Sequence, residues 1–425
     1  MFDTPLREAH LRVLDRLAGH RADAARQAES ARGADDRRAA VTGTRELETA
    51  PWGVTADGGD AACEIVLDYG ELEAEYAAIR RGTALFDRVD RVVVELRGTD
   101  AVDLVDRLVT NAVAKATSAI VAAFLLERTG RIVSDLRVIR LDGRLLLEMD
   151  RTDAAAVAAA VDRVVFTEDC TIEDASAVQH RLDALGPEAP ATIEHLVGRS
   201  IGAGEAAEAT IDGVPVVVFA LDPERGGDLD VPGIGIVAPT AEVERVWNAI
   251  IERPAPGRRP VRAIGWNAFN IARIEAGTPL FHLDFGPDAL PHETGLIAKR
   301  VDFRKGCYPG QEVVARMESR AGGRGRRRVV GLRLDGAALP VAGGQVFDAE
   351  GGIADQVGVV TSSTVSPMRG AASIAFATVR ASHVDPGTRV LVNADGGSEP
   401  ATVTGLDLEL ELATDAGTSA EESSS

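Results

Sequence analysis

The chain has 425 residues, of which 66 are Asp or Glu and 46 are Lys or Arg, so its formal net charge at pH 7 is −20. A chain of this length normally forms two or three domains. The acidic excess argues against a protein whose main task is to grip a phosphate backbone, and direct nucleic-acid binding is not expected. Hydrophobic residues make up 45% of the chain, which predicts a packed core rather than disorder.

The three cysteines, Cys63, Cys170 and Cys307, are far apart in the sequence. They form neither a disulfide framework nor the paired spacing of a metal site, so no metal ligands are expected. The apolar runs are all shorter than the roughly 18–20 residues that span a bilayer. The N-terminal segment is charged and periodic, unlike a signal peptide. We therefore expect a cytoplasmic protein without membrane contact.

In chain order, residues 4–20 place apolar side chains at helical spacing behind a threonine and a proline, which predicts a helix. Residues 21–62 hold few large hydrophobic side chains, and we expect a flexible insertion there, with the ordered chain resuming near Glu64. Alternating segments between 124 and 149, separated by Thr-Gly and Asp-Gly pairs, predict an antiparallel meander. Helices are also predicted over 71–80, 100–115 and 153–165, and a strand over 91–97.

From residue 327 onward, the predicted elements change from mixed helices and strands to strands alone. From 327 to 411, short strands alternate with glycine-rich turns, which is typical of a small all-β barrel or sandwich. Strands joined by hairpins and interleaved with helices favour an α+β fold. Before this region, strands are predicted over 211–220 and 229–237, helices over 240–251 and 262–276, and a Pro/Gly/Arg connector over 254–260.

The segment with the densest set of chemically reactive side chains is RKGCYPGQEVVARM, residues 304–317. Its glycines and proline predict a tight loop that could press its backbone against a ligand. Lys305, two residues from Cys307, would favour the thiolate, and Tyr308 offers a stacking face. A structured turn with an incidental cysteine is an equal alternative. The nearest histidine, His292, lies far upstream, which argues against a cysteine nucleophile with a local base.

The octapeptide KGCYPGQE, residues 305–312, resembles the signature loop of the YgfZ family of folate-binding proteins, which are relatives of the glycine cleavage T-protein, an aminomethyltransferase. Other segments resemble the family in the same order along the chain. They are EYAAIRRGTALFDRV (75–89), LVTNAV (108–113), TGRIVSDLRVIR (129–140), ARIEAGTPLF (272–281) and LPHETGL (290–296). The matched segments run from near the N-terminus to about residue 411, with 21–62 as an unmatched insertion.

The resemblance implies a three-domain T-protein-like ring around a folate channel. Residues 1–89 with 171–255 would form a discontinuous α+β domain, and 90–170 a second one. Residues 256–325 would be a connector that carries the KGCYPGQE loop. A C-terminal β-barrel would span 326–411 and a disordered tail 412–425.

The resemblance also implies a site and a ligand. Tetrahydrofolate would bind in the channel, and Asp135 would match the second aspartate of a T-protein pair near the reactive nitrogens of the folate. Cys307, the hallmark residue of the loop, and Asp135 are the expected catalytic residues. The expected folate contacts are Asp135, Arg273, Glu275, Lys305, Tyr308, Gln311, Glu312 and Arg316. Simpler roles stay open, such as a solvent-facing strand position for Asp135 and ion pairs for Arg273 and Glu275.

Several positions depart from the T-protein pattern. Ser134 stands where the first aspartate would be, and only Asp228 or Asp230 could replace the pterin-binding glutamate. Asn270 belongs to an altered stretch before the Arg-x-Glu-Ala-Gly segment. These changes argue against aminomethyl transfer from a lipoyl carrier and leave folate binding with altered contacts. The six arginines between residues 316 and 328 suit a folate glutamate tail, a phosphate-bearing partner such as tRNA, or a solvated connector.

Three functions compete at this point. The first is a YgfZ-type tetrahydrofolate-binding protein that supports iron–sulfur cluster assembly or repair, and indirectly tRNA modification, with iron–sulfur client proteins as partners and Cys307 as its functional thiol. The second is a folate-dependent aminomethyltransferase or demethylase in which Asp135 orients or deprotonates the substrate amine. The third is a non-catalytic interaction protein that docks through 21–62 and the arginine run.

Overall fold

The computed structural model describes residues 3–31, 47–53, 62–321, 325–351 and 355–408. It divides into two compact units, Met1–Gly325 and Arg326–Ser425, and each is described by itself. The predicted tail over 412–425 lies outside the described residues, as do 32–46 and 54–61 of the predicted insertion. Within the described ranges, none of the helices is both long enough and apolar enough to cross a membrane.

The N-terminal region is more regular than the sequence predicts. Helix α1 (Arg7–Ala31) continues well past residue 20, and strand β1 (Glu48–Trp52) pairs antiparallel with β2 (Cys63–Asp68). The prediction that the ordered chain resumes near Glu64 is therefore wrong. The sequence of β1, ETAPW, lacks an apolar alternation, so its strand forms through pairing with β2 and through burial of Trp52 in a small apolar cluster.

The first unit contains a six-stranded sheet in the order β10-β11-β12-β9-β3-β13. All neighbours are antiparallel except β13, which runs parallel to β3. The strands are β3 (Ala84–Asp87), β9 (Gln179–Leu185), β10 (Ala206–Ile211), β11 (Val214–Leu221), β12 (Gly233–Pro239) and β13 (Arg262–Ile264).

A five-stranded antiparallel sheet in the order β5-β6-β7-β4-β8 completes this unit. The consecutive pairs β5–β6 and β6–β7 confirm the predicted meander. The strands are β4 (Arg91–Arg97), β5 (Ile120–Leu126), β6 (Ile132–Leu141), β7 (Arg144–Asp150) and β8 (Thr171–Asp174).

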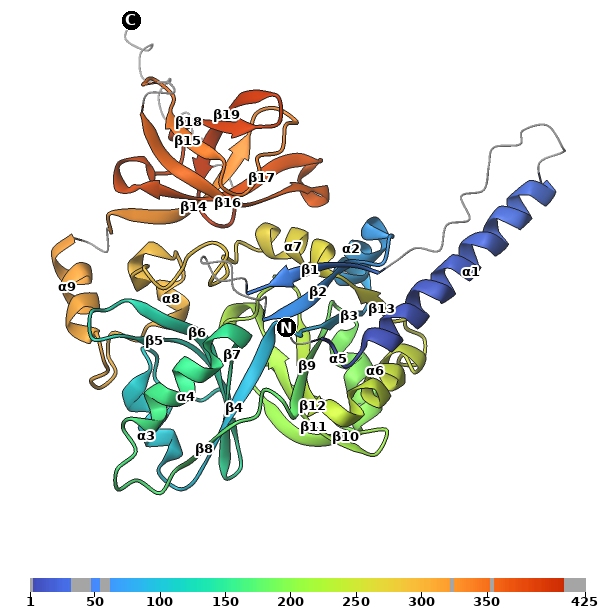
Figure 1. The fold of residues 1–425 in the computed structure, drawn as a ribbon, viewed down its shortest axis with the longest axis horizontal. Helices are drawn as coiled ribbons and strands as arrows, with labels where there is room; N and C mark the ends of the chain where they lie inside the picture. Colours follow the sequence, from blue (N-terminus) through green and yellow to red (C-terminus); the bar gives the residue numbers. More distant parts are fainter. Residues whose placement is uncertain (1–2, 32–46, 54–61, 322–324, 352–354, 409–425) are drawn as a thin grey trace, which may run out of the picture. The chain divides into compact units, whose positions relative to one another are not determined.

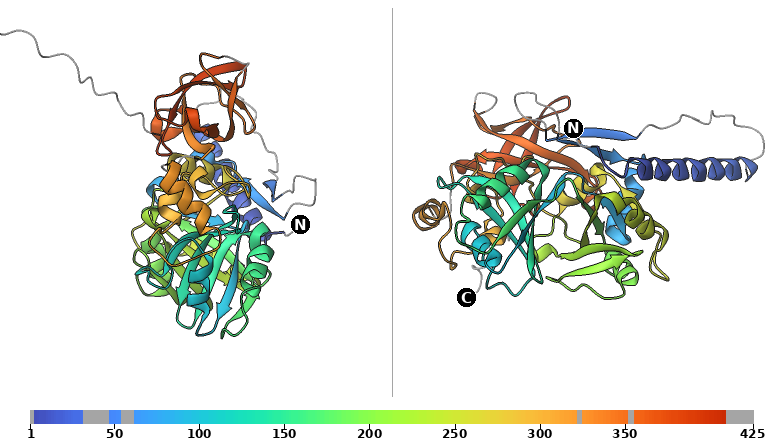
Figure 2. Two further views of the ribbon diagram at one scale, coloured as in Figure 1. Left: turned by 90° about the vertical axis from the view of Figure 1, so that its left-hand side faces the viewer. Right: turned by 60° about the horizontal axis from the view of Figure 1, so that its bottom comes forward.

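Some helices of the first unit cover the outer faces of the two sheets (Figures 1 and 2). One apolar core packs α1, α5 and α6 on the six-stranded sheet, and a second packs α3 and α4 on the five-stranded sheet. A third core lies between the sheets and includes residues of α2 and α7. The helices are α2 (Leu72–Arg81), α3 (Ala101–Leu108), α4 (Ala154–Asp162), α5 (Ala189–Val197), α6 (Val243–Glu252), α7 (Trp266–Glu275), α8 (Ile297–Arg300) and α9 (Gln311–Ala321).

The second unit is a closed six-stranded barrel in the order β14-β17-β16-β15-β18-β19, with an apolar interior. Both the α+β class and the predicted C-terminal β-barrel are confirmed. Its strands are β14 (Arg327–Leu334), β15 (Gln345–Asp348), β16 (Gln356–Ser366), β17 (Ala372–Arg380), β18 (Arg389–Ala394) and β19 (Gly397–Thr404). Single 3₁₀ turns in the two units are η1 (Arg151–Asp153), η2 (Pro223–Arg225), η3 (Thr240–Glu242), η4 (Pro291–Glu293), η6 (Pro367–Arg369) and η7 (Ala381–His383).

A buried polar cluster ties the start of α1 to the six-stranded sheet. The Oδ2 atom of Asp87 accepts a hydrogen bond from Thr4 Oγ1 at 2.6 Å and contacts His10 Nε2 at 3.0 Å. Its Oδ1 atom contacts His180 Nε2 at 2.6 Å, and the Tyr69 hydroxyl lies 2.7 Å from His10 Nδ1. Burial alone would raise the pKa of Asp87, but the two histidines outweigh it and hold this pKa far below its ordinary value.

Replacing Asp87 by Asn should lower the free energy of unfolding by about 1–3 kcal/mol, because a neutral amide cannot accept from all three donors. The folded-state pKa of Asp87 is depressed, so its ionisation stabilises the fold above an unfolded-state pKa of about 4. That contribution is lost as the pH falls toward the folded-state pKa. Urea unfolding should separate wild type from Asp87→Asn more at pH 7 than at the lowest pH where both fold. Equal separation at both pH values would contradict this account.

Candidate functional site

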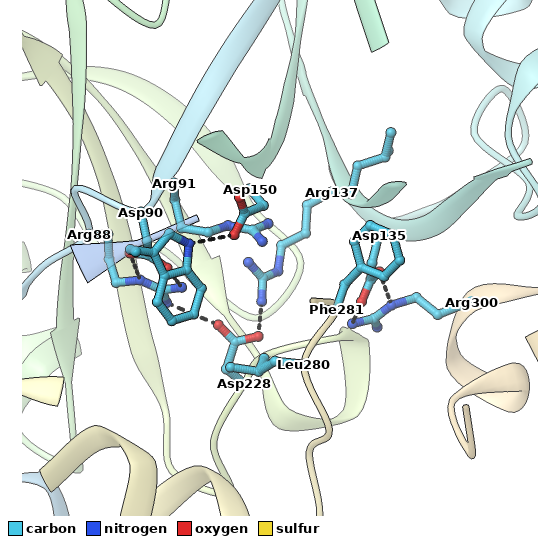
Figure 3. Close-up of a pocket in the computed structure, with 12 residues that line it drawn as sticks. Arg88, Asp90, Arg91, Asp135, Arg137, Asp150, Asp228, Leu280, Phe281 and Arg300 are labelled. Atoms are coloured by element: carbon cyan, nitrogen blue, oxygen red, sulfur yellow. Dashed lines mark hydrogen bonds and ion pairs between the residues drawn. The ribbon is translucent and has the colours of Figure 1, made fainter. Parts of the chain in front are cut away.

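A pocket lies in the first unit at one end of the space between the two sheets (Figure 3). Its cavity volume is about 20 Å³, room for about one water molecule, and the empty space that includes the open solvent at its mouth comes to about 400 Å³. Charged side chains and a few apolar ones line it together. The lining residues are Trp52, Arg88, Asp90, Arg91, Asp135, Leu136, Arg137, Asp150, Asp228, Leu280, Phe281 and Arg300.

Arg88, in the turn between β3 and β4, lies at the centre of the charged floor. Its guanidinium donates to both carboxylate oxygens of Asp90 at 2.9 and 2.8 Å. It also donates to Asp183 at 3.0 Å and to Asp228 at 3.1 Å, and it lies over the ring of Phe269. Burial would lower the pKa of Arg88, but the three carboxylates raise it well above its ordinary value. Arg88 is therefore a permanent buried cation.

Glu148 on β7 is the second centre of the same network and is fully buried. Its carboxylate accepts from Arg91 Nε at 2.7 Å, Arg91 Nη2 at 2.8 Å and Arg137 Nη1 at 2.9 Å. Burial would raise the pKa of Glu148, but these arginines lower it well below its ordinary value. Arg137 also pairs with Asp228, which joins the two centres. Together with Arg181, which pairs with Asp183, four arginines balance four carboxylates.

Asp135 is paired with Arg300, the last residue of α8. Arg300 Nε donates to Asp135 Oδ1 at 2.7 Å, and its Nη2 lies 3.4 Å from Oδ2. Figure 3 shows this pair beside Phe281, apart from the contact of Asp228 with Arg88 and Arg137. The side chain of Asp135 is 12% exposed, so the simpler expectation of a solvent-facing strand residue is wrong.

A hydrogen-bonded chain forms another wall of the pocket region. Trp52 Nε1 donates to Asp150 Oδ2 at 2.9 Å, and Asp150 accepts from the Thr152 hydroxyl at 2.7 Å. His282 Nε2 lies 3.2 Å from that hydroxyl and 2.7 Å from Asp153 Oδ1. Burial would lower the pKa of His282, but Asp153 outweighs it and raises this pKa.

Ser134, which stands where the T-protein pattern has its first aspartate, is buried and belongs to the same wall. Its hydroxyl donates to Asp153 Oδ2 at 2.7 Å. A serine at this position therefore serves the internal hydrogen-bonding chain, whereas the next residue, Asp135, faces the pocket.

Two of the predicted folate contacts, Arg273 and Glu275 on α7, are buried in ion pairs. Arg273 donates to Asp284 Oδ2 at 2.5 Å and to Asn270 Oδ1 at 2.9 Å. Glu275 Oε2 accepts from the Tyr76 hydroxyl at 2.6 Å and from Arg80 Nη2 at 2.5 Å. Neither is among the described residues that line the pocket.

Lys305 points into the body of the unit, with 2% of its side chain exposed. Its ammonium donates to the carbonyl oxygens of Val109 at 2.7 Å and Asn111 at 3.0 Å, and also to that of Asp106. These carbonyls lie at and just after the C-terminal end of α3, where a cation is favourable. Burial lowers the pKa of Lys305. Its hydrogen bonds give it a role in holding the loop to α3.

The other predicted contacts lie along the loop and the first turns of α9. Cys307 is exposed, whereas Tyr308 is buried with its ring 5.6 Å from the Lys305 ammonium. Gln311 begins α9, and Glu312 pairs with Arg316 one turn later at 2.5 Å on an exposed face. The loop residues are not among the described residues that line the pocket, so the structure brings only Asp135 of the predicted set into it.

Gly310 fixes how this loop rests on the β5–β6 turn. Its φ is +79°, and an added Cβ would lie 2.5 Å from the Glu127 carbonyl oxygen and 2.9 Å from the Cα of Gly130. The backbone of the loop therefore approaches the β5–β6 turn closely.

Replacing Gly310 by Ala should displace the loop and cost about 2–4 kcal/mol of stability through the positive φ and the clash. Cys307 should then react faster with a thiol reagent, because the loop that carries it is no longer held in place. The reagent reports mainly on Cys307, since Cys63 is buried and Cys170 half-buried. Gly306→Ala is the matched control, because nothing lies within 4 Å of an added Cβ there. Equal thiol reactivity and equal unfolding in both variants would show that Gly310 does not hold the loop.

Arg300, Trp52, Arg88 and Asp150 were not predicted as site residues. For Arg88, the only sequence signal is that charged residues recur among the valines and leucines around β4 and β9. A solvent-facing strand and a buried polar network produce the same alternation, so this signal does not tell them apart. Trp52 lies in the span expected to be an insertion, and Arg300 follows a motif that ends at residue 296.

Comparison with known proteins gives two matching family models. The GCVT N-terminal domain matches residues 63–305, and the glycine cleavage T-protein C-terminal barrel domain matches residues 327–408. An aminomethyltransferase from Streptomyces avermitilis is 29% identical over 356 residues, covering 81% of this chain and 91% of its own. A probable aminomethyltransferase from Halobacterium salinarum is 28% identical, covering 80% of this chain and 90% of its own.

Among solved structures, the aminomethyltransferase T of the glycine cleavage system from Bartonella henselae has a TM-score of 0.71 at 22% identity. The match covers 85% of this chain and 94% of that one, which confirms the T-protein fold. The N-terminal family model alone spans more than half of the sequence. The chain therefore belongs to the glycine cleavage T-protein (GCVT) family.

Proposed function

We propose that this protein binds tetrahydrofolate and transfers a one-carbon unit to it from an amine donor. The observation that carries the proposal is the position of Asp135, the one predicted catalytic residue that faces the pocket. Relatives of similar length named aminomethyltransferase support the same reaction class. In this role Asp135 orients the substrate amine or takes up its proton.

The pocket is lined by the types of side chain that a folate needs. A pterin is a flat ring with a donor-rich edge, and it needs apolar faces and a carboxylate. Trp52, Leu280 and Phe281 supply apolar faces. Asp135 is a carboxylate shared with a single arginine, whereas Asp228 is shared with Arg88 and Arg137. The apolar residues would therefore hold the ring of the folate, which supplies the nitrogens that accept the one-carbon unit, and Asp135 would face the substrate amine beside it.

Tetrahydrofolate titration tests the proposal directly. Trp52 lines the pocket and its ring lies 4.9 Å from that of Trp266, so binding should quench tryptophan fluorescence, with a dissociation constant on the order of micromolar. Formation of methylene-tetrahydrofolate from an aminomethyl donor should accompany it. Absence of both a fluorescence change and a calorimetric signal would overturn the proposal.

A second candidate is the YgfZ-type role in iron–sulfur cluster assembly or repair. It is favoured by the exposure of Cys307 in a loop held in place by Gly310 and Lys305. This role predicts that Cys307→Ala lowers the activity of an iron–sulfur enzyme in a strain lacking the chromosomal gene. Restoration of that activity by Cys307→Ala to the wild-type level would count against it.

A further inference from the structure

The Asp135–Arg300 pair differs from the other ion pairs of the pocket in how few partners it has. Arg88, Glu148 and Asp228 are each shared among several opposite charges. Within the described residues, the ion-pair partner of Asp135 is Arg300 alone. A full guanidinium–carboxylate fork has two bonds of about 2.8 Å, whereas here one contact is 2.7 Å and the other 3.4 Å.

One hydrogen-bond donor of Arg300 has no partner among the described residues. Its side chain is 4% exposed, and its Nη1 atom is buried with no hydrogen-bond partner among the described residues. A buried charged donor without an acceptor is unfavourable, so an acceptor supplied from outside would stabilise it.

Gly226 leaves room for this guanidinium. Its φ is +92°, and an added Cβ would lie 2.9 Å from Arg300 Nη1 and 2.6 Å from the Cβ of Ala122. The backbone therefore keeps space for Arg300 close to the pocket while leaving one nitrogen unpaired.

We propose that the Asp135–Arg300 pair is a binding site for a small zwitterionic amino acid, with its ammonium on Asp135 and its carboxylate on Arg300. A lone anion at Arg300 would be repelled by Asp135, and a lone cation at Asp135 by Arg300. A zwitterion replaces both halves of the pair at once, so no buried charge is left unmatched. The remaining charges of the floor already balance each other, four against four.

The lining of the pocket suits a small ligand. The cavity volume of about 20 Å³ is too small for glycine, so the ligand would occupy the space of about 400 Å³ that includes the open mouth. Leu136, Leu280 and Phe281 are the apolar residues near the pair. These residues accommodate a methyl or methylene group and offer nothing to a third charge. The inference concerns a second ligand and goes beyond tetrahydrofolate binding, because its test uses no folate.

Calorimetric titration of the full chain with glycine, acetate and methylamine tests the proposal without any substitution. Acetate and methylamine each carry one half of the charge of glycine. We expect glycine to bind at least about tenfold more tightly than either, because only glycine satisfies both members of the pair. Glycine affinity no greater than that of acetate or methylamine would overturn the proposal.

Variants locate the binding. Arg300→Gln and Asp135→Asn should each weaken glycine binding by at least about tenfold. Arg304→Gln should leave it unchanged, since that arginine is 95% exposed and four residues away on the same segment. Unchanged glycine affinity in Arg300→Gln would overturn the proposal. A parallel tetrahydrofolate titration of wild type separates the two claims. If wild type binds glycine but not folate, the proposed function is contradicted. If it binds folate but not glycine, this inference is contradicted.

Discussion

Glu148→Gln should lower the free energy of unfolding by about 3–5 kcal/mol, the cost of removing one partner from a buried ion pair. The glutamine would keep the shape of the side chain but leave Arg91 and Arg137 with unmatched positive charge between the two sheets. Arg137 is buried and the Arg91 side chain is only 13% exposed, so little water can replace the lost carboxylate. Urea unfolding at neutral pH measures the difference. The slope of the unfolding free energy against urea concentration should be the same in both proteins, which checks two-state behaviour.

Glu208→Gln is the matched control for this prediction. Glu208 also pairs with an arginine, Arg144 on a strand of the other sheet at 2.6 Å, but its side chain is 63% exposed. An exposed pair contributes less than about 1 kcal/mol, because water solvates both partners after the substitution. If the two variants lost the same stability, the charged floor would not be a buried network in solution.

Much of the fold follows from local sequence patterns. The meander of β5, β6 and β7 and the C-terminal barrel were predicted because apolar alternation and glycine-rich turns repeat there at short intervals. The helix predicted over 100–115 ends at Leu108, because Val109 turns to an extended conformation and bridges to Leu125. Such a stop depends on a distant strand and cannot be seen in a local pattern.

The site was harder to predict than the fold, for a physical reason. In a sheet with one face in water, alternate polar residues point to solvent, and the same alternation in β6 and β9 suggests an exposed face. Here both faces of the sheets are covered, so Arg137, Arg181 and Asp183 point into a buried interface. Their function depends on pairing across strands distant in sequence. Asp135 could be predicted because a family motif surrounds it.

Asp135→Asn should reduce methylene-tetrahydrofolate formation by at least about 100-fold, the usual contribution of a positioned acid or base. The amide keeps the size of the side chain but can neither take up a proton nor hold a cationic amine. Tetrahydrofolate affinity should change much less than the rate, since apolar faces from Trp52, Leu280 and Phe281 remain. Single-turnover assays with an aminomethyl donor, together with the fluorescence titration, separate the two effects.

Asp288→Asn is the control for this variant, because Asp288 also pairs with an arginine, Arg131, but is 86% exposed. Asp135→Asn leaves Arg300 without its counter-charge, so an unfolding curve must show that the variant is folded when it is assayed. If transfer survived in Asp135→Asn and vanished in Cys307→Ala, the chemistry would lie in the exposed loop rather than in the pocket. That outcome would overturn the role of Asp135 and make the loop thiol, the hallmark residue of the YgfZ-type resemblance, the residue on which function depends.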